Sequence, residues 1–280
     1  DKAISLNPNY LDSYHNRCLA LNYSPKWSLE FVFNKHKEFG NYFNKLDKSQ
    51  KYLDRMHIDP DKILNIGYVS GDFRNHSVSY FFKPLLKSHN HKLVKVFCYY
   101  NNDIVDETTE ELKKISYKWR NIYNLSDNQV CKLIQEDKID ILVDLSGHTK
   151  NNRLLVFCKK PAPIQVSWLG YPNTTGLNTI DYRFTDKLAD TDISSQYYTE
   201  KLIYLKNTFL CFEGDEDIDI NFDIPLLNNG FITFGSFNNL SKVNRNVLEV
   251  WSKILIKLPN SRLVLKGPQF KSNSIGFEKI

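Results

Sequence analysis

The central part of the chain alternates short apolar runs with amphipathic segments, and this alternation predicts its fold. Apolar runs of strand length occur at residues 63–69, 139–145 and 164–169, and segments with helical spacing of apolar residues lie between them. Because these runs are apolar at consecutive positions, they are typical of a parallel sheet that helices cover on both faces. The pattern therefore predicts an α/β protein, in which ligands bind beyond the carboxyl ends of the strands.

The first part of the chain predicts helices instead. Apolar residues recur at helical spacing from Leu11 to Leu21, and a second helix is expected to begin at Pro25 with Ser24 as its N-cap. The stretch AISLNPNY resembles the junction of two tetratricopeptide repeats, which predicts that residues 1–48 are the end of such a repeat region. The same pattern also fits an unrelated helical hairpin, and the local sequence leaves both open.

Changes in composition divide the rest of the chain. We expect a linker at 49–62, an α/β lobe at 63–213, an acidic connector at 214–229 and the start of a second α/β lobe at 230–280. The chain begins with Asp1 rather than methionine, and the pattern of the second lobe stops soon after it starts. We therefore expect a fragment that is open at both ends, with no readable targeting signal.

Composition and charge argue against several classes of function. The 280 residues are 41% hydrophobic and 25% charged, which is ordinary for a globular protein of about two domains. The net charge of +5 is spread without a basic run, which argues against a nucleic-acid binder, and no apolar run has the length of a membrane span. The five cysteines form no C-x-x-C pair, so their spacing supports no zinc or redox site and favours reduced thiols in the cytoplasm.

Motifs of three common α/β enzyme classes are absent from the sequence. No G-x-G-x-x-G follows the first predicted strand, which argues against a nicotinamide dehydrogenase. The phosphate-binding G-x-x-x-x-G-K-[ST] of nucleotide hydrolases and the G-x-S-x-G of serine hydrolases are also missing.

Polar loops after the predicted strands hold the candidate functional residues. His76 lies in SGDFRNHS, His148 and Thr149 lie in SGHTKNNR, and Gly170 lies in LGYPNTTG. An imidazole at such a position can exchange a proton or hydrogen-bond a sugar or phosphate, although it equally can satisfy backbone groups of its own loop. Lys242 precedes a predicted helix, where an ammonium group and the helix N-terminus together bind phosphate. A solvated lysine is the alternative.

Five longer motifs occur together in one order: NIGYVSGDFRNHSVSYFFKPLL, ILVDLSGHTKNNRL, PAPIQVSWLGYPNTTGL, DYRFTD and FGSFNNLSK. In these motifs the chain resembles the protein O-linked N-acetylglucosamine transferases and their SPINDLY-like relatives, from Ile63 to Lys266. The resemblance implies two Rossmann-like lobes of the GT-B type, the second of them incomplete here, preceded by tetratricopeptide repeats. It also implies an inverting glycosyltransferase that uses a nucleotide sugar.

The resemblance assigns roles to individual residues. His76 matches the histidine at the reaction centre and Lys242 matches the lysine that contacts the diphosphate, so both are expected to be catalytic. Asn239 stands near the nucleotide, where the animal enzymes have glutamine. The animal enzymes have tyrosine at the position of His148, and this departure leaves the sugar donor open. The residues expected to bind the substrate, besides Asn239, are His148, Thr149, Leu169, Gly170 and Pro172.

The resemblance predicts transfer of N-acetylglucosamine from UDP-GlcNAc to serine and threonine hydroxyls of proteins, with the acceptor bound through the repeats. No metal or cofactor is expected, and the acidic stretch GDEDIDI is interpreted as a solvated linker. GDP-fucose as donor, a non-protein acceptor and a non-catalytic adaptor are the alternatives. Because the later nucleotide-binding motifs of the family are absent, the chain by itself is expected to bind the donor weakly and to be inactive.

Overall fold

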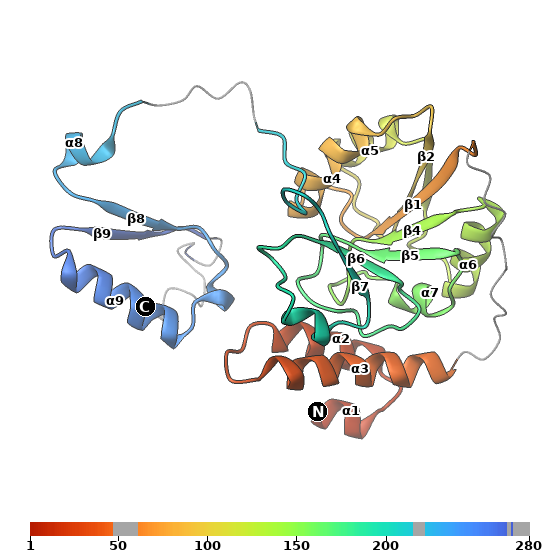
Figure 1. Cartoon of the computed structure of the whole chain (residues 1–280), viewed down its shortest axis with the longest axis horizontal. Helices are drawn as coiled ribbons and strands as arrows, with labels where there is room; N and C mark the ends of the chain where they lie inside the picture. Colours follow the sequence, from red (N-terminus) through yellow and green to blue (C-terminus); the bar gives the residue numbers. More distant parts are fainter. Residues whose placement is uncertain (47–60, 215–221, 268–269, 271–280) are drawn as a thin grey trace. The chain divides into compact units, whose positions relative to one another are not determined.

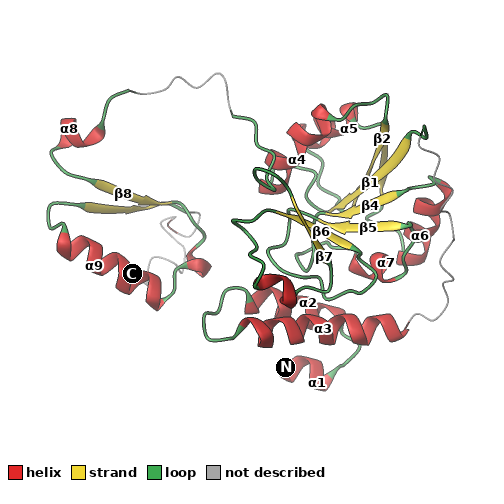
Figure 2. Cartoon of the chain, in the orientation of Figure 1, coloured by secondary structure: helices red, strands yellow, loops and turns green. Residues whose placement is uncertain are grey.

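Seven parallel strands form the sheet that organises residues 1–214 (Figures 1 and 2). Their spatial order is β3-β2-β1-β4-β5-β6-β7, and every neighbouring pair is parallel. The α/β fold class that the consecutive apolar runs predicted is therefore confirmed. The strands are β1 (Leu64–Ser70), β2 (Val94–Tyr100), β3 (Lys118–Asn121), β4 (Ile141–Asp144), β5 (Ile164–Ser167), β6 (Tyr182–Thr185) and β7 (Lys201–Tyr204).

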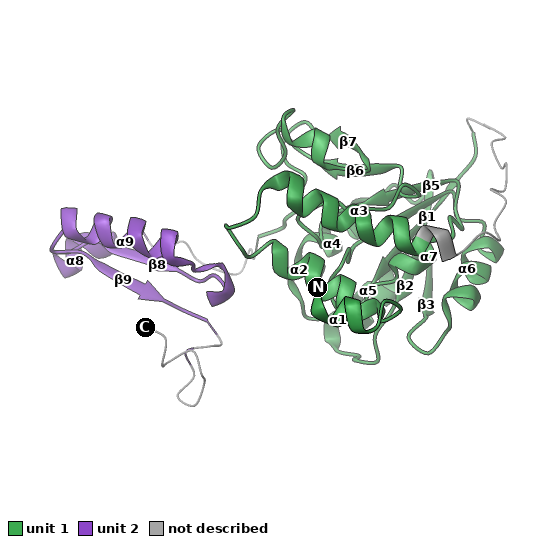
Figure 3. Cartoon of the chain, turned by 90° about the horizontal axis from the view of Figure 1, so that it is seen from below, with its two compact units in different colours: residues 1–214 green, residues 215–280 purple. Residues whose placement is uncertain are grey.

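The computed structural model divides the chain into two compact units, residues 1–214 and 215–280, which are drawn in green and purple in Figure 3. Most of the expected linker at 49–62 and the first part of the expected connector at 214–229 lie outside the described residues. No helix of the described part is both long and apolar enough to cross a membrane. The described residues are 1–46, 61–214, 222–267 and 270.

Helices cover both faces of the seven-stranded sheet. They are α4 (Ser77–Ser88), α5 (Glu107–Ile115), α6 (Asp127–Glu136) and α7 (Leu154–Cys158), with a 3-10 turn η1 (Ser194–Tyr197) before β7. Successive side chains of a strand point to opposite faces, so Tyr68 enters the core under α4 and α5, whereas Val69 enters the core under α6 and α7. This alternation explains why the strands are apolar at consecutive positions.

The N-terminal helices belong to the same compact unit as the sheet. They are α1 (Lys2–Leu6), α2 (Leu11–Leu21) and α3 (Leu29–Leu46). Cys18 of α2 and Phe39 of α3 lie in one buried cluster with Phe157 of α7. The amphipathic faces that the sequence predicted are thus buried against the α6 and α7 side of the sheet. The assignment of these helices to a tetratricopeptide repeat stays a prediction.

Helix α3 begins later than the sequence predicted. Residues 25–27 form a turn and a bend, and the first helical residue is Leu29 rather than Pro25. The amide of Phe31 donates to the hydroxyl oxygen of Ser28 at 3.2 Å, so Ser28 has the capping role that was expected of Ser24.

The second unit repeats the order of strand, polar loop, helix and strand that the sequence predicted. Strands β8 and β9 pair in parallel, and the loop after β8 contains a short 3-10 turn, η2. The elements of the second unit are α8 (Pro225–Asn229), β8 (Thr233–Ser236), η2 (Leu240–Lys242), α9 (Arg245–Lys257) and β9 (Arg262–Leu265).

Candidate active site

Loops that follow β1, β2, β4 and β5 meet at the carboxyl edge of the sheet, where parallel strands place their ligands. The amide group of Asn102 donates to the carbonyl oxygen of Gly71 at 2.8 Å. The amide group of Asn101 donates to the carbonyl oxygen of Asn151, also at 2.8 Å. A Cβ on Gly71 would lie 2.6 Å from the Cβ of Asn151, so the β1 and β4 loops touch where no side chain fits. The loops therefore form one connected rim.

His76 ends the β1 loop and is the N-cap of helix α4. Its Nδ1 accepts the amide hydrogen of Val78 at a donor–acceptor distance of 3.3 Å, and its side chain is 37% exposed. Because Nδ1 supplies the accepting lone pair, the neutral ring carries its hydrogen on Nε2. A carboxylate oxygen of Asp72 lies 3.7 Å from Nδ1 and would pair with the ring if it were protonated. The ring is thus arranged to donate a hydrogen bond through Nε2.

The β1 loop that carries His76 is held by its own polar contacts. The amide of Asp72 donates to the hydroxyl oxygen of Ser70 at 2.9 Å, and the hydroxyl of Ser79 donates to the carbonyl oxygen of Asp72 at 2.7 Å. The guanidinium of Arg74 lies 3.3 Å from the Asp72 carboxylate. These contacts fix the carboxylate beside the imidazole.

The β4 loop is built around a buried carboxylate. Asp144 accepts the amide hydrogens of Ser146 at 3.1 Å and Gly147 at 2.8 Å, and burial raises its pKa to about 6. Gly147 has φ 53°, and a Cβ there would lie 2.3 Å from the Cβ of Tyr171, so glycine is required both by conformation and by space. Thr149 is partly exposed and its hydroxyl donates to the carbonyl oxygen of Ser146 at 2.8 Å.

The β5 loop contains a residue in the left-handed region. Leu169 has φ 71°, which is uncommon outside glycine, asparagine and aspartate and is found where surrounding structure imposes it. The next residue, Gly170, passes so close to the β4 loop that a Cβ would lie 1.7 Å from the carbonyl oxygen of Leu145. Pro172 is exposed at the tip of this loop. The sequence-predicted residues Leu169, Gly170 and Pro172 therefore share the rim with Thr149.

Glu200 anchors the far end of the β5 loop from within the protein. Its buried carboxylate accepts the hydroxyl hydrogen of Thr174 at 2.6 Å and the amide hydrogen of Thr175 at 2.7 Å. The Thr175 hydroxyl also donates to it. Thr174 and Thr175 belong to one short loop segment, so the carboxylate holds this segment in place.

His148 lies behind the rim, in contact with the N-terminal helices. The ring is buried, its Nε2 lies 2.9 Å from the carbonyl oxygen of Thr175, and its Nδ1 lies 2.8 Å from Nδ1 of His15. Burial lowers the pKa of His148 well below its usual value, so the ring is neutral at pH 7. The carbonyl can only accept, so Nε2 carries the hydrogen and Nδ1 accepts from His15. The expected contact of His148 with the sugar stays a prediction that this geometry does not favour.

Lys242 and Asn239 lie in the second unit, in the loop between β8 and α9. Both side chains are exposed, and the amide of Lys242 donates to the carbonyl oxygen of Asn239 at 2.9 Å. Helix α9 begins at Arg245 with the side chain of Asn244 as its N-cap, so Lys242 lies near a helix N-terminus as predicted. Because Lys242 and His76 belong to different units, their expected approach across a cleft stays a prediction.

Sequence reasoning missed three carboxylates that shape the rim: Asp72, Asp144 and Glu200. Asp144 had a readable signal, because it ends a buried strand and precedes Ser-Gly, a typical place for an aspartate that binds the amides of the following turn. Asp72 lies inside the motif NIGYVSGDFRNHSVSYFFKPLL, but it was not among the predicted site residues. Glu200 had no local signal, because the threonines that it binds lie 26 and 25 residues away.

Comparison with known proteins identifies the family. The model of "Glycosyl transferase family 41" matches residues 40–222, which include all the loops of the rim. A rice protein named "Probable UDP-N-acetylglucosamine--peptide N-acetylglucosaminyltransferase SPINDLY" is 44% identical over 279 residues, which cover 98% of this chain and 30% of that protein. A Caenorhabditis elegans enzyme of the same transferase name is 36% identical over 168 residues, which cover 59% of this chain and 14% of the enzyme.

A solved structure is similar as well. An O-GlcNAc transferase mutant from Thermobaculum terrenum has a TM-score of 0.87 and 35% sequence identity, over 95% of this chain and 50% of that chain. Its similarity agrees with the fold class of the GT-B type that the resemblance implied. The chain spans 30% of the length of the rice relative, so it matches only part of that protein. By the match over residues 40–222 and the identity to SPINDLY proteins, the chain belongs to glycosyl transferase family 41.

Proposed function

We propose that the chain is part of an inverting glycosyltransferase that moves N-acetylglucosamine from UDP-GlcNAc to serine and threonine hydroxyls of proteins. The names of the rice and Caenorhabditis elegans relatives and of the solved structure support this donor. The observation that carries the proposal is the family match over residues 40–222, because it contains the rim with His76, Thr149 and Gly170. No metal takes part in the proposed transfer.

In this reaction a hydroxyl oxygen attacks the anomeric carbon opposite the leaving nucleoside diphosphate. The new carbon–oxygen bond forms as the bond to the phosphate oxygen breaks, and the hydroxyl proton passes to water. We assign His76 to orient a reacting oxygen, because its Nδ1 already accepts from Val78 and its Nε2 carries the hydrogen. A ring in this state donates a hydrogen bond and has no free lone pair with which to take a proton.

The phosphate side of the reaction is assigned to Lys242. Negative charge grows on the departing phosphate oxygen, and an ammonium group beside the N-terminus of α9 stabilises that charge more in the transition state than in the ground state. By analogy with oxyanion sites, one well-placed donor of this kind contributes about 3 kcal/mol.

The mode of acceptor binding and the cellular compartment form a separate part of the proposal. The protein acceptor would bind through tetratricopeptide repeats, which the AISLNPNY junction supports. We place the protein in the cytoplasm, because the five cysteines of the sequence are all free thiols.

A His76→Ala variant of the full-length protein tests the site. Transfer to a peptide acceptor should fall by at least about 100-fold, the usual contribution of a positioned proton-transfer or hydrogen-bonding group. The free energy of unfolding should fall by no more than the contribution of an N-cap, which is about 1 kcal/mol. His91→Ala is the matched control, because His91 is an exposed histidine of the same unit. Undiminished transfer by His76→Ala would make His76 a structural cap only.

The donor is tested by calorimetric titration on the full-length protein. UDP-GlcNAc should bind more tightly than GDP-fucose, and tighter binding of GDP-fucose would replace the proposed donor with the alternative one. Donor binding without any transfer to protein or other acceptors would favour the adaptor.

A further inference from the structure

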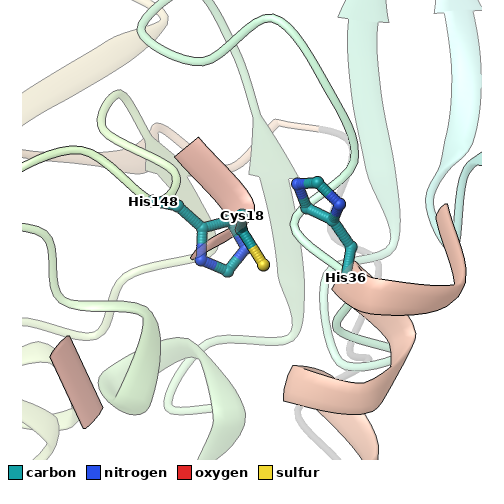
Figure 4. A group of neighbouring side chains, drawn as sticks. All are labelled: Cys18, His36 and His148. Carbon is teal, nitrogen blue, oxygen red and sulfur yellow. The ribbon is translucent and has the colours of Figure 1, made fainter. Parts of the chain in front are cut away.

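A group of potential metal ligands lies between the N-terminal helices and the β4 loop (Figure 4). Cys18 comes from α2, His36 from α3 and His148 from the β4 loop, so three elements that are distant in sequence converge there. All three side chains are buried, and one ligand atom of each lies within 4.8 Å of those of the other two. The wide spacing explains why the sequence offered no zinc motif.

The outer ring nitrogens of both histidines are fixed by backbone carbonyls. His36 Nδ1 lies 2.7 Å from the carbonyl oxygen of Val32, and His148 Nε2 lies 2.9 Å from that of Thr175. Because a carbonyl only accepts, each of these nitrogens carries the ring hydrogen. The lone pairs therefore lie on His36 Nε2 and His148 Nδ1. A hydrogen bond from the outer nitrogen to a backbone carbonyl is how metal-binding histidines are usually oriented.

The inner nitrogens accept hydrogen bonds that a cation can replace. The Tyr171 hydroxyl lies 2.7 Å from His36 Nε2, and His15 Nδ1 lies 2.8 Å from His148 Nδ1. The Nε2 of His15 is buried without a hydrogen-bond partner. The thiol of Cys18 has a weak contact with the carbonyl oxygen of Lys35 at 3.8 Å and also interacts with the guanidinium of Arg17. Three soft or borderline donors thus face a common space, and an ion bound there would replace the hydrogen bonds that Tyr171 and His15 make to the two rings.

We propose that Cys18 Sγ, His36 Nε2 and His148 Nδ1 bind one divalent metal ion of the zinc class. In a tetrahedral zinc site, ligand atoms are about 3.4 to 3.6 Å apart. The ligand atoms lie within 4.8 Å of one another, so the widest pair has to close by at most about 1.4 Å when the ion binds. Binding removes the proton of the Cys18 thiol, so the thiolate balances one of the two charges of the ion.

The site is structural rather than catalytic. All three ligands are buried and none reaches the exposed rim, so a substrate bound at the rim would not contact the ion. A bound ion would tie α2 and α3 to the loop that carries Thr149. It would therefore stabilise the folded state, by a free energy that grows with the logarithm of the free metal concentration.

Metal content of the full-length protein tests the proposal. After treatment with a chelator and dialysis against zinc, wild type should hold one more zinc ion per chain than Cys18→Ser. Removing a ligand should weaken binding by more than the roughly 10- to 100-fold loss that follows removal of an outer hydrogen-bond partner. Cys131→Ser is the matched control, because Cys131 is a buried thiol of the same core with a similar contact, 3.9 Å to the carbonyl oxygen of Val156. It should keep the full zinc content.

Cobalt titration of wild type gives an outcome that needs no variant. Cobalt(II) should produce a thiolate-to-metal charge-transfer band and tetrahedral ligand-field bands, and Cys18→Ser should lose the charge-transfer band. The proposal is overturned if wild type gives no such band, or if Cys18→Ser and wild type hold equal zinc. In that case the cluster is a hydrogen-bonded packing contact. Should Cys18→Ser fail to fold, His36→Gln takes its place in the zinc measurement.

Discussion

Replacing Gly40 by alanine tests whether the backbone of helix α3 packs directly against the loop that follows β5. A Cβ on Gly40 would lie 1.8 Å from the carbonyl oxygen of Gly176 and 2.7 Å from its carbonyl carbon. The contact is reciprocal, because a Cβ on Gly176 would lie 2.1 Å from the carbonyl oxygen of His36, one turn earlier on α3. The backbone of α3 therefore touches the backbone of the β5 loop.

Effects of opposite sign compete in Gly40→Ala. Alanine in a helix interior is favoured over glycine by about 1 kcal/mol. Against this, a methyl group at 1.8 Å from a backbone oxygen must move away by more than about 1 Å, and overpacking of this severity costs about 3 kcal/mol. The loop cannot shift freely, because Glu200 binds the amide of Thr175. The net loss of about 2 kcal/mol should lower the melting temperature by about 4 to 8 °C.

Thermal unfolding followed by circular dichroism measures this difference. Asn41→Ala is the control for helix propensity, because Asn41 is the exposed neighbour on α3, and it should raise the melting temperature slightly. Gly214→Ala should leave it unchanged, because no atom lies within 4 Å of a Cβ there. A rise for Gly40→Ala like that for Asn41→Ala would refute the backbone contact and the placement of α3 against the loop.

Three other predictions concern charged groups. Lys242→Met should slow transfer and weaken calorimetrically measured nucleoside diphosphate binding, and unaltered binding would remove its phosphate role. Asp137→Asn should lower the free energy of unfolding in urea by about 3 kcal/mol, since the buried carboxylate binds Lys118 and Arg120, each at 2.7 Å. An unchanged free energy of unfolding would mean that the two ion pairs do not stabilise the fold. Burial raises the Asp144 pKa to about 6 from 3.8, so the folded state binds more protons between these values. The stability of the wild-type protein relative to Asp144→Asn should fall by about 2 kcal/mol from pH 4 to pH 7; a pH-independent difference contradicts this.

The sheet and its ligand-binding edge could be predicted because their signals are local. Consecutive apolar positions in the β1 and β4 segments indicate burial on both faces, and the loop that follows each strand then lies at a known edge. His76 could be placed on this edge from its position between a strand and a helix. Its role as the N-cap of α4 required coordinates, because histidine is not among the favoured capping residues.

The partners of buried groups could not be predicted in the same way. The amphipathic pattern of α2 and α3 shows that one face is buried, but it does not say which surface covers that face. Glu200 looks like an exposed surface residue in the sequence, and only its contacts with Thr174 and Thr175 reveal that it is buried and bonded. Carboxylates are almost never buried without partners, and those partners come from distant parts of the chain.

Position 148 shows how such contacts change the meaning of a sequence difference. In the sequence, histidine at this position, where the animal enzymes have tyrosine, leaves the sugar donor open. In the structure both ring nitrogens of His148 are bound within the protein, to Thr175 and to His15. A change of side chain there acts first on the support that α2 gives to the loop. Within the first unit, the more exposed residues Thr149 and Pro172 are therefore better placed than His148 to contact a donor, and their part in donor choice stays a prediction.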